Sequence, residues 1–404
     1  MSEAKKTKII GFLNTYTSGV SGADVRFVEV MKRLNEDRCL EITVVTSKLG
    51  KDFCRDRGLN SKTIVTTSES NVVFGDVILL YVRRLLSVFR LIYPVDKNTV
   101  LYSSSDFLPD VFPGFFQKFK NKKCKWVSMI HLIAPNPFFQ LNGSGEKVAI
   151  KLSKNALFYK MAQIVSIIMM KWWADVIFVV NSDIRNYLLN FGIKQEKIVL
   201  VNNGIDVEKF NIAEFSENHH TFDACFVGRF HMQKGLFDLV NIWSMVCKEK
   251  PAAKLAIVGG GPEKLRSELE KAILAKRMVG NIKILGALNE AGKINVLHSS
   301  KMLIFPSTYE SWGIVAAEAM ACGLPVIAWN LPVYEKIFPQ GMIKVPLGDV
   351  SVFSQEIIKL LENAELCSKI GKEASCVVSK YDWNIVANHE LILLKGVLNN
   401  CCLQ

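Results

Sequence analysis

The sequence lacks several features that mark secreted, membrane-spanning or metal-dependent proteins. Its ten cysteines form no C-x-x-C pair, and the chain begins with the charged segment Met1 to Lys8, so we expect reduced thiols in a cytoplasmic protein. The uncharged run Met161 to Met170 is ten residues long, whereas a membrane-spanning helix needs about 20. Because the chain contains no Asp-x-Asp pair and no cluster of histidine and cysteine ligands, we predict no metal site and no cofactor.

Acidic residues are scarce in the first half of the chain. Residues 1–200 contain 29 Lys and Arg against 17 Asp and Glu, a net charge of +12, while residues 201–404 contain 21 of each kind. The excess predicts an anionic partner for the first half: a lipid surface, a phosphorylated acceptor or nucleic acid. Because the sequence contains no basic helix-turn-helix, aromatic ribonucleoprotein motif or zinc module, we predict no nucleic-acid partner.

Apolar runs alternate with helical segments along all 404 residues, a length that exceeds the usual size of one core. The expected strands are residues 8–14, 41–46, 99–102, 125–130, 176–180, 197–201, 223–227, 254–258, 283–285, 302–305 and 325–328. This alternation predicts an α/β protein with two Rossmann-like domains, each a doubly wound parallel sheet. We place the domains at residues 1–205 and 206–382. A terminal helix is expected in residues 383–404. The sequence is compatible with its packing on either domain, including a return to the N-terminal one.

One segment of the second half carries two glutamates eight positions apart, Glu310 and Glu318. A strand, a loop and a helix are expected across residues 302–321. The free N–H groups near Gly313 and Ile314 would then form a positive helix end that suits a phosphate. Glu318 is costly to bury among alanines without hydrogen-bond donors, and a ribose diol would supply two hydroxyls. The alternative is that Glu310 caps the helix and Glu318 faces water.

Two further strand-to-helix loops of the second half contain glycines and basic residues. The first contains Gly228, Arg229 and Lys234, and two cations beside a helix N-terminus can hold a diphosphate from both sides. The second contains Gly260 and Gly261, which permit close approach of the backbone to a nucleotide. Taken alone, the second loop is equally compatible with a tight turn.

In this combination, the run from Asn202 to Pro325 resembles the donor-binding half of the retaining glycosyltransferases of family 4, whose GT-B fold has two Rossmann-like domains facing a central cleft. The similar pieces are Asn203-Gly204-Ile205-Asp206, Gly228-Arg229 with Lys234-Gly235, Gly259 to Pro262, Pro306-Ser307, and Glu310 and Glu318 with Gly323-Leu324-Pro325-Val326. Two positions of the first half depart from the family's pattern. Ser21 precedes Gly22 where Gly-Gly is usual, and Leu132 follows His131 where aspartate is usual.

Carried over by position, the resemblance implies that Arg229 and Lys234 bind the diphosphate of a donor, that Glu318 binds its ribose, and that Glu310 binds the transferred sugar. It also implies that retention needs no enzyme nucleophile and that the two cations replace a metal at the leaving phosphate. The predicted donor-binding residues are Gly22, Gly228, Arg229, Lys234, Gly260, Gly261, Glu310, Trp312, Gly313, Ile314 and Glu318. The predicted catalytic residues are His131, Arg229, Lys234 and Glu310.

Two of these candidates lie in the first half of the chain. His131 follows the expected strand 125–130, where the resemblance implies contact with the donor sugar, and the alternative is a strand-end histidine satisfied by its neighbours. Gly22 lies in the first loop, where the phosphate or the acceptor is expected. Asp24 either belongs to that site or is a carboxylate at the N-terminus of a helix.

The expected enzyme is a retaining, metal-independent hexosyltransferase. It moves a sugar from a UDP- or GDP-type donor to a hydroxyl of a glycan acceptor, and a lipid-linked glycan is one form that this acceptor can take. The alternatives are a nucleotide-sugar epimerase and a catalytically silent nucleotide-sugar binding protein of the same fold. An epimerase needs acid and base residues across the sugar, and His131 is the one obvious candidate in the first domain.

Basic and apolar residues are mixed in residues 81–92, 118–125 and 156–173. These segments predict peripheral contact with an anionic membrane surface, on its cytoplasmic face, through the basic N-terminal domain. The alternative is an ordinary buried helix over residues 156–170 and a solvated basic face elsewhere.

Overall fold

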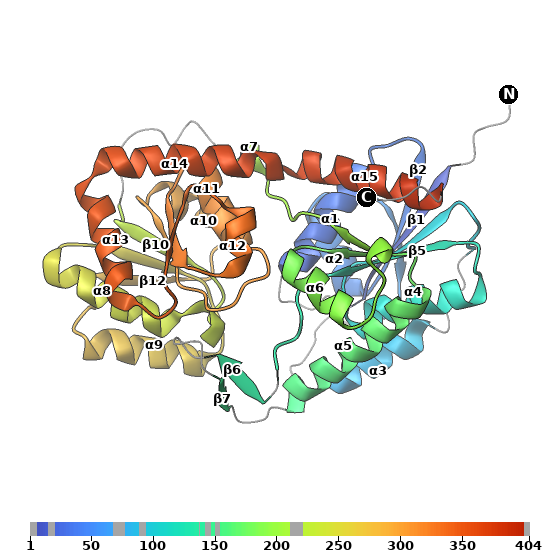
Figure 1. Cartoon of the computed structure of the whole chain (residues 1–404), viewed down its shortest axis with the longest axis horizontal. Coiled ribbons are helices and arrows are strands. Elements are labelled where there is room, and N and C mark those ends of the chain that lie inside the picture. The colour runs from blue at the N-terminus through green and yellow to red at the C-terminus, as the bar shows by residue number, and fades with distance from the viewer. Residues whose placement is uncertain are drawn as a thin grey trace. The chain divides into compact units, whose positions relative to one another are not determined.

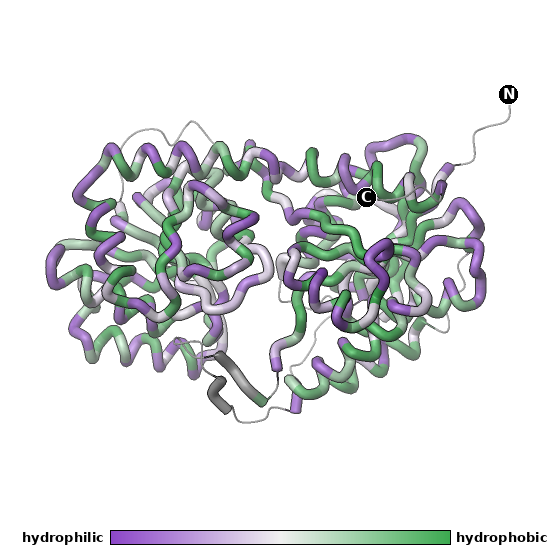
Figure 2. The backbone as a smooth tube through the Cα atoms, in the orientation of Figure 1, coloured by the Kyte–Doolittle hydropathy of each residue, from purple (hydrophilic) through white to green (hydrophobic). Residues whose placement is uncertain are grey.

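The computed structural model describes residues 6–14, 21–67, 77–88, 94–136, 138–141, 147–149, 154–210 and 221–399 of the chain. The chain divides into two compact units, which are described separately below (Figure 1). The first unit comprises residues 1–140, 148–204 and 383–404, and the second comprises residues 141–147 and 205–382. In both units the strands are largely apolar (Figure 2), as expected for parallel sheets that helices cover on both faces.

The first unit contains a seven-stranded parallel sheet with the order β3-β2-β1-β4-β5-β8-β9. Its strands are β1 (Thr7–Leu13), β2 (Leu40–Thr46), β3 (Lys62–Val65), β4 (Thr99–Ser103), β5 (Lys125–Ile130), β8 (Val176–Val179) and β9 (Ile198–Leu200). Its helices are α1 (Gly22–Leu34), α2 (Lys48–Asp56), α3 (Val77–Val88), α4 (Leu108–Lys120), α5 (Lys154–Trp173), α6 (Ser182–Asn190) and α15 (Trp383–Leu398). The short strands β6 (Phe139–Leu141) and β7 (Lys147–Ala149) form a separate two-stranded sheet. Of the basic segment 81–92, residues 89–92 lie outside the described residues.

The second unit contains a six-stranded parallel sheet with the order β12-β11-β10-β13-β14-β15. Its strands are β10 (Ala224–Val227), β11 (Leu255–Val258), β12 (Ile282–Gly286), β13 (Leu303–Phe305), β14 (Val326–Trp329) and β15 (Met342–Val345). Its helices are α7 (Val207–Phe210), α8 (Leu236–Glu249), α9 (Glu263–Ala275), α10 (Glu290–His298), α11 (Ile314–Ala321), α12 (Pro332–Ile337), α13 (Val350–Glu362) and α14 (Ala364–Val378). The predicted fold class, two Rossmann-like doubly wound sheets, is confirmed.

The strand order of each sheet reverses at one point. In the second unit the chain leaves β10 toward β11 and β12 on one side and returns to β13, β14 and β15 on the other. The first unit has the same arrangement about β1 and β4. Ligands of such sheets bind at the carboxyl ends of the strands beside this reversal. The two loops that matter most in the second unit are therefore those that follow β10 and β13.

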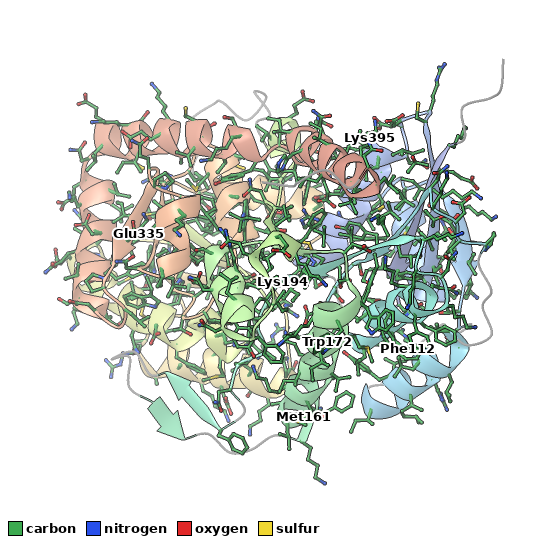
Figure 3. All side chains as sticks on the ribbon, turned by 45° about the vertical axis from the view of Figure 1, so that its right-hand side comes forward. Phe112, Met161, Trp172, Lys194, Glu335 and Lys395 are labelled. Carbon is green, nitrogen blue, oxygen red and sulfur yellow. The ribbon has the colours of Figure 1, made fainter. Side chains whose placement is uncertain are left out.

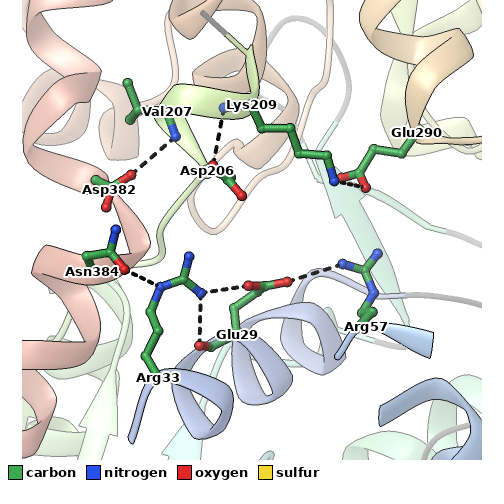
Figure 4. A network of polar contacts seen from close by, with 9 residues as sticks. All are labelled: Glu29, Arg33, Arg57, Asp206, Val207, Lys209, Glu290, Asp382 and Asn384. Atoms are coloured by element: carbon green, nitrogen blue, oxygen red, sulfur yellow. Dashed lines mark hydrogen bonds and ion pairs between the residues drawn. The ribbon is translucent and has the colours of Figure 1, made fainter. Parts of the chain in front are cut away.

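The terminal helix α15 packs on α1 of the first unit through a buried ion pair. Arg26 of α1 donates from Nη2 to Glu390 Oε2 of α15 at 2.5 Å, and the hydroxyl of Tyr102 donates to Glu390 Oε1 at 2.6 Å. The side chains of Arg26 and Glu390 are 0% and 1% exposed. At the start of α15, Arg33 Nε donates to Asn384 Oδ1 at 2.8 Å (Figure 4). Buried charges of this kind fix one packing arrangement, because each is costly without the other.

Asp382, the residue before α15 in the sequence, and the residues of α7 are bonded within the second unit. The Val207 N–H donates to Asp382 Oδ2 at 3.3 Å, and Lys209 at the end of α7 pairs with Glu290 at the start of α10 (Figure 4).

None of the helices in the described ranges combines the length and the apolar content that crossing a bilayer requires.

We expect Glu390→Ala to lower the free energy of unfolding of the first unit by about 3–5 kcal/mol, because it leaves the buried Arg26 guanidinium uncompensated. Lys395→Ala is the matched control. It removes the exposed pair of α15 with Asp37, whose side chains are 49% and 23% exposed, and should cost less than about 1 kcal/mol. Urea unfolding measures the free energy of unfolding of both variants, and limited proteolysis around residue 383 reports whether α15 is still packed on the unit. Equal effects of the two substitutions would contradict the structural role of Glu390.

Candidate functional site

The loops that follow β10 and β13 contact each other at the carboxyl edge of the second sheet. The Thr308 N–H, in the loop after β13, donates to the carbonyl of Gln233, in the loop after β10, at 2.9 Å. The loop after β11 joins them, because the Phe230 N–H donates to the Gly260 carbonyl at 2.8 Å. The three glycine-containing loops selected from the sequence therefore form one continuous surface at the reversal of strand order.

Glycine at position 235 makes the contact between the first two loops possible. Gly235 has φ +65°, and a Cβ built there would lie 2.0 Å from the backbone oxygen of Pro306. A similar constraint holds at Gly259, where a Cβ would lie 1.8 Å from the Gly228 oxygen. Any larger residue must push these loops apart, so both glycines are needed to keep the surface continuous.

A lysine and a glutamate face each other across this surface. Lys234 ends a short 3-10 helix (Met232–Lys234) after β10, and its Nζ pairs with Glu310 Oε1 in the loop after β13. The two side chains are 21% and 12% exposed, so both charges are partly desolvated. The sequence predicts both residues as site residues, and the structure brings them into direct contact.

Positive charge accumulates in the loop after β10. Burial lowers the pKa of His231, and the nearby charges of Arg229 and Lys234 lower it further. The Gln233 N–H donates to His231 Nδ1 at 3.3 Å, so that nitrogen is an acceptor and carries no proton. Arg229 is exposed at the surface, while Lys234 is partly buried. The loop thus offers one exposed and one partly buried cation to an anionic ligand.

Helix α11 begins directly after the loop of Glu310. Gly313 caps its N-terminus with φ +93°, and Ile314 is its first residue. The first N–H groups of a helix have no acceptor within the helix and attract anions. Trp312, predicted from the sequence to bind the donor, is 1% exposed, and its indole packs edge-on against Phe338 and Tyr381.

Glu318 lies one turn further along α11 and has a partner that the sequence reasoning missed. Lys293 of α10 donates from Nζ to Glu318 Oε1 at 2.6 Å, and the side chains are 19% and 12% exposed. Glu318 Oε2 is buried and has no hydrogen-bond partner among the described residues. The carboxylate therefore has unused hydrogen-bonding capacity. The one signal in the sequence was Glu318 itself, since a carboxylate among alanines needs a donor from another element.

His131 and Gly22 lie in the first unit. His131 follows β5 and its Nε2 lies 2.9 Å from the carbonyl oxygen of Ser104, after β4. Burial, and then the charge of Arg26, lowers the pKa of His131 from 6.5 to about 3. The imidazole is therefore neutral at physiological pH, and Nε2 carries the proton that is donated to Ser104.

Gly22 is the first residue of α1, and its neighbours form a capping box. The Asp24 N–H donates to Ser21 Oγ at 3.2 Å, and the Ser21 N–H donates to Asp24 Oδ2 at 3.1 Å. Asp24 therefore caps the helix, in agreement with the role of a carboxylate at a helix N-terminus. Gly22 itself is exposed at the start of the helix.

The remaining predicted residues lie in the second unit with the two ion pairs. The Gly228 N–H donates to the Val258 carbonyl at 3.0 Å, and Gly260 and Gly261 are exposed beside it. Within the described ranges, no three His, Cys, Asp or Glu side chains are grouped as a metal ion would require.

Residues 207–375 match the family model described as "Glycosyl transferases group 1". This match lies within the second unit. The resemblance to family 4 glycosyltransferases of GT-B fold is thereby confirmed. A phosphatidyl-myo-inositol mannosyltransferase of Mycobacterium tuberculosis is 29% identical over 201 residues, 47% of this chain and 52% of the relative. The chain thus spans about half the length of this relative.

Two further comparisons cover almost the whole chain. An uncharacterized glycosyltransferase of Methanocaldococcus jannaschii is 23% identical over 391 residues, 94% of this chain and 96% of the relative. The crystal structure of Anabaena HepE in complex with UDP and glucose has a TM-score of 0.73, with 16% identity, and covers 96% of this chain and 100% of that one. At that identity, the structural likeness shows the fold alone.

We expect the His131 imidazole to stay neutral down to about pH 5, because its pKa is lowered to about 3. A folded-state pKa below the unfolded one adds stability that is present above pH 6.5 and is lost as the pH falls toward 3. Between pH 6.5 and pH 5 the loss is about 2 kcal/mol. NMR titration of labelled histidine, assigned with His131→Gln, measures the pKa directly. A midpoint at or above pH 6 would contradict the burial of this ring.

Proposed function

We propose that the chain is a retaining hexosyltransferase that takes a sugar from a UDP- or GDP-type donor and transfers it to a hydroxyl of a glycan or lipid-linked acceptor without a metal. The observation that carries this proposal is the contact of Lys234 with Glu310 at the reversal of strand order. One cation and one carboxylate there match the two halves of a sugar diphosphate, which has an anionic end and a hydroxylated end.

The ligand-free pairing suggests how a donor enters. A diphosphate oxygen would replace the Glu310 carboxylate at Lys234 Nζ, and sugar hydroxyls would replace the ammonium at Glu310. Each charge then keeps a partner throughout, so neither bears the cost of an isolated, partly buried ion. Glu318 would act in the same way toward the ribose hydroxyls, using the hydrogen-bonding capacity that Lys293 leaves unfilled.

Transfer of the sugar builds negative charge on the leaving phosphate and positive charge on the anomeric carbon. Fixed cations at the phosphate stabilise that separation more than they stabilise the bound donor, which is the condition for rate enhancement. Lys234 and Arg229 would serve this role together with the N–H groups at the start of α11. Retention would follow from attack of the acceptor hydroxyl on the face that the phosphate leaves, and the acceptor proton would pass to the departing phosphate.

The relatives support the choice of substrate class. One is named for mannosyl transfer to phosphatidyl-myo-inositol, and one solved neighbour contains UDP and glucose. A nucleotide-sugar epimerase is the alternative, and it needs an acid and a base across the sugar. His131, with a pKa of about 3, holds almost none of its cationic, proton-donating form at neutral pH. A silent binding protein would release no nucleoside diphosphate at all.

We expect Lys234→Ala, Arg229→Ala and Glu310→Gln each to lower donor turnover about 100-fold or more, by analogy with the loss of one oxyanion donor, which costs about 2.7–4 kcal/mol. Release of nucleoside diphosphate from a panel of UDP- and GDP-sugars measures this, and product analysis separates transfer from epimerisation. Lys301→Ala is the matched control, since its pair with Asp223 joins β10 and β13 at the opposite, amino-terminal edge. Near wild-type turnover in the three site variants would end the assignment.

We expect UDP or GDP to raise the melting temperature of the protein in proportion to the logarithm of ligand concentration, because the ligand binds only the folded state. The rise should shrink in Lys234→Ala and Glu318→Ala and persist in Lys301→Ala. Comparison of the two nucleotides identifies the base of the donor. If neither nucleotide raises the melting temperature, or if the site variants respond like the wild type, the proposed donor site is wrong.

A further inference from the structure

Helix α5 of the first unit exposes large apolar side chains along one face. Met161, Val165, Ile168 and Trp172 are 54%, 39%, 44% and 71% exposed, and their spacing of four, three and four residues places them on one side of the helix. Met161 and Trp172 lie along this helix in Figure 3. A soluble helix ordinarily carries polar residues at such positions.

The buried side of α5 is apolar as well, with one polar anchor. Its buried residues are Ala162, Gln163, Ser166, Ile167 and Met170, and Gln163 donates from Nε2 to Asp106 Oδ2 and to the Leu132 carbonyl, each at 2.8 Å. Large apolar side chains therefore occupy both the inner and the outer side of this helix. An apolar outer side on a helix whose inner side already packs on the unit indicates that another apolar phase covers it.

Helix α3 adds a second apolar stripe beside the first. Four of its residues share one face at helical spacing and are 41–59% exposed, namely Ile78, Leu79, Val82 and Leu86. Tyr81 on the buried side of α3 packs against Phe158 and Tyr159 of α5, with ring centroids 5.2 and 6.0 Å apart. The two helices therefore lie together on the outer surface of the unit (Figure 1), and we call their eight exposed residues the α3–α5 apolar face.

Basic residues accompany this face, and acidic ones are nearly absent. Helices α3, α4 and α5 contain a single acidic residue, Asp110, which is buried and accepts hydrogen bonds from Ser104 and Ser105. The exposed basic residues on or next to these helices are Arg83, Lys120, Lys122, Lys123 and Lys154. Five exposed cations thus lie on or next to these helices, while Asp175, two residues after α5, is paired with Lys118 and Lys125.

We infer that the α3–α5 apolar face docks on a bilayer surface that carries anionic headgroups, with the helices lying in the interface. Apolar residues bordered by lysine and arginine, with a tryptophan at one end, are the combination that such an interface stabilises. A second copy of the chain is a poorer occupant, because it would bring the same cations together without acidic partners. This inference does not depend on the proposed catalytic function.

Flotation of the full chain with vesicles tests it. We expect co-flotation with phosphatidylcholine vesicles that contain phosphatidylglycerol and at least tenfold weaker binding to pure phosphatidylcholine vesicles. Binding should also weaken at about 0.5 M salt, where the Debye length falls to about 4 Å. The combined variant Leu86→Gln, Ile168→Gln and Trp172→Gln removes apolar area without changing charge. It should lose at least nine-tenths of the bound fraction.

The matched control is Leu274→Gln with Val279→Gln, which replaces two apolar residues of the second unit that are each 66% exposed. This control should float like the wild type, and both variants should keep the wild-type melting temperature because all five positions are exposed. Absence of wild-type flotation, equal flotation of the two variants, or a salt-independent interaction would overturn the inference. So would a lipid-free dimer in analytical ultracentrifugation that the combined variant dissociates, since the face would then join two chains.

Discussion

Compensation of partly buried charge is the constraint on which the candidate site depends. Glu310 and Glu318 are eight positions apart on one loop and helix, and each side chain is 12% exposed. Two such carboxylates are tolerable only because each meets a lysine. Lys234 comes from the loop after β10 and Lys293 from the helix before β13, so the pairs form only when the parallel sheet is assembled. The fold and the charge pattern of the site are therefore established together.

The first unit applies the same rule with a different result. Arg26, Glu390 and Tyr102 are buried and bonded to one another, which leaves no room for a ligand to exchange with any of them. That cluster fixes α15 on α1, whereas the pairs of the second unit remain partly open to solvent. Arg26 also contributes to the lowered pKa of His131, so the packing of the terminal helix and the protonation state of a candidate residue are linked.

Sequence reasoning identified the buried strands and the ligand-facing loops, because continuous apolar runs and glycine turns are local signals. The expected strands at residues 125–130 and 302–305 agree with β5 and β13 to within one residue. The strands β3 and β15 were not predicted, since both lie at sheet edges and carry lysine in four-residue segments. Lys293 was missed because its contact with Glu318 joins separate helices, and no spacing along the chain encodes it. The packing of the Trp312 indole was likewise set by Phe338 and Tyr381, far along the sequence.

The orientation of α5 lies beyond sequence reasoning for a related reason. Between Lys160 and Lys171 every residue is uncharged, so periodicity does not distinguish its inner from its outer side. In the folded unit, Ile167 and Met170 face inward, while Val165 and Ile168 remain exposed. Full burial of one large apolar side chain is worth about 1.5–3 kcal/mol, so leaving the exposed stripe in water forgoes stability. Burial of Ile167 and Met170 and the hydrogen bond of Gln163 to Asp106 hold the helix in this orientation, and they do not by themselves account for the apolar residues on its outer side.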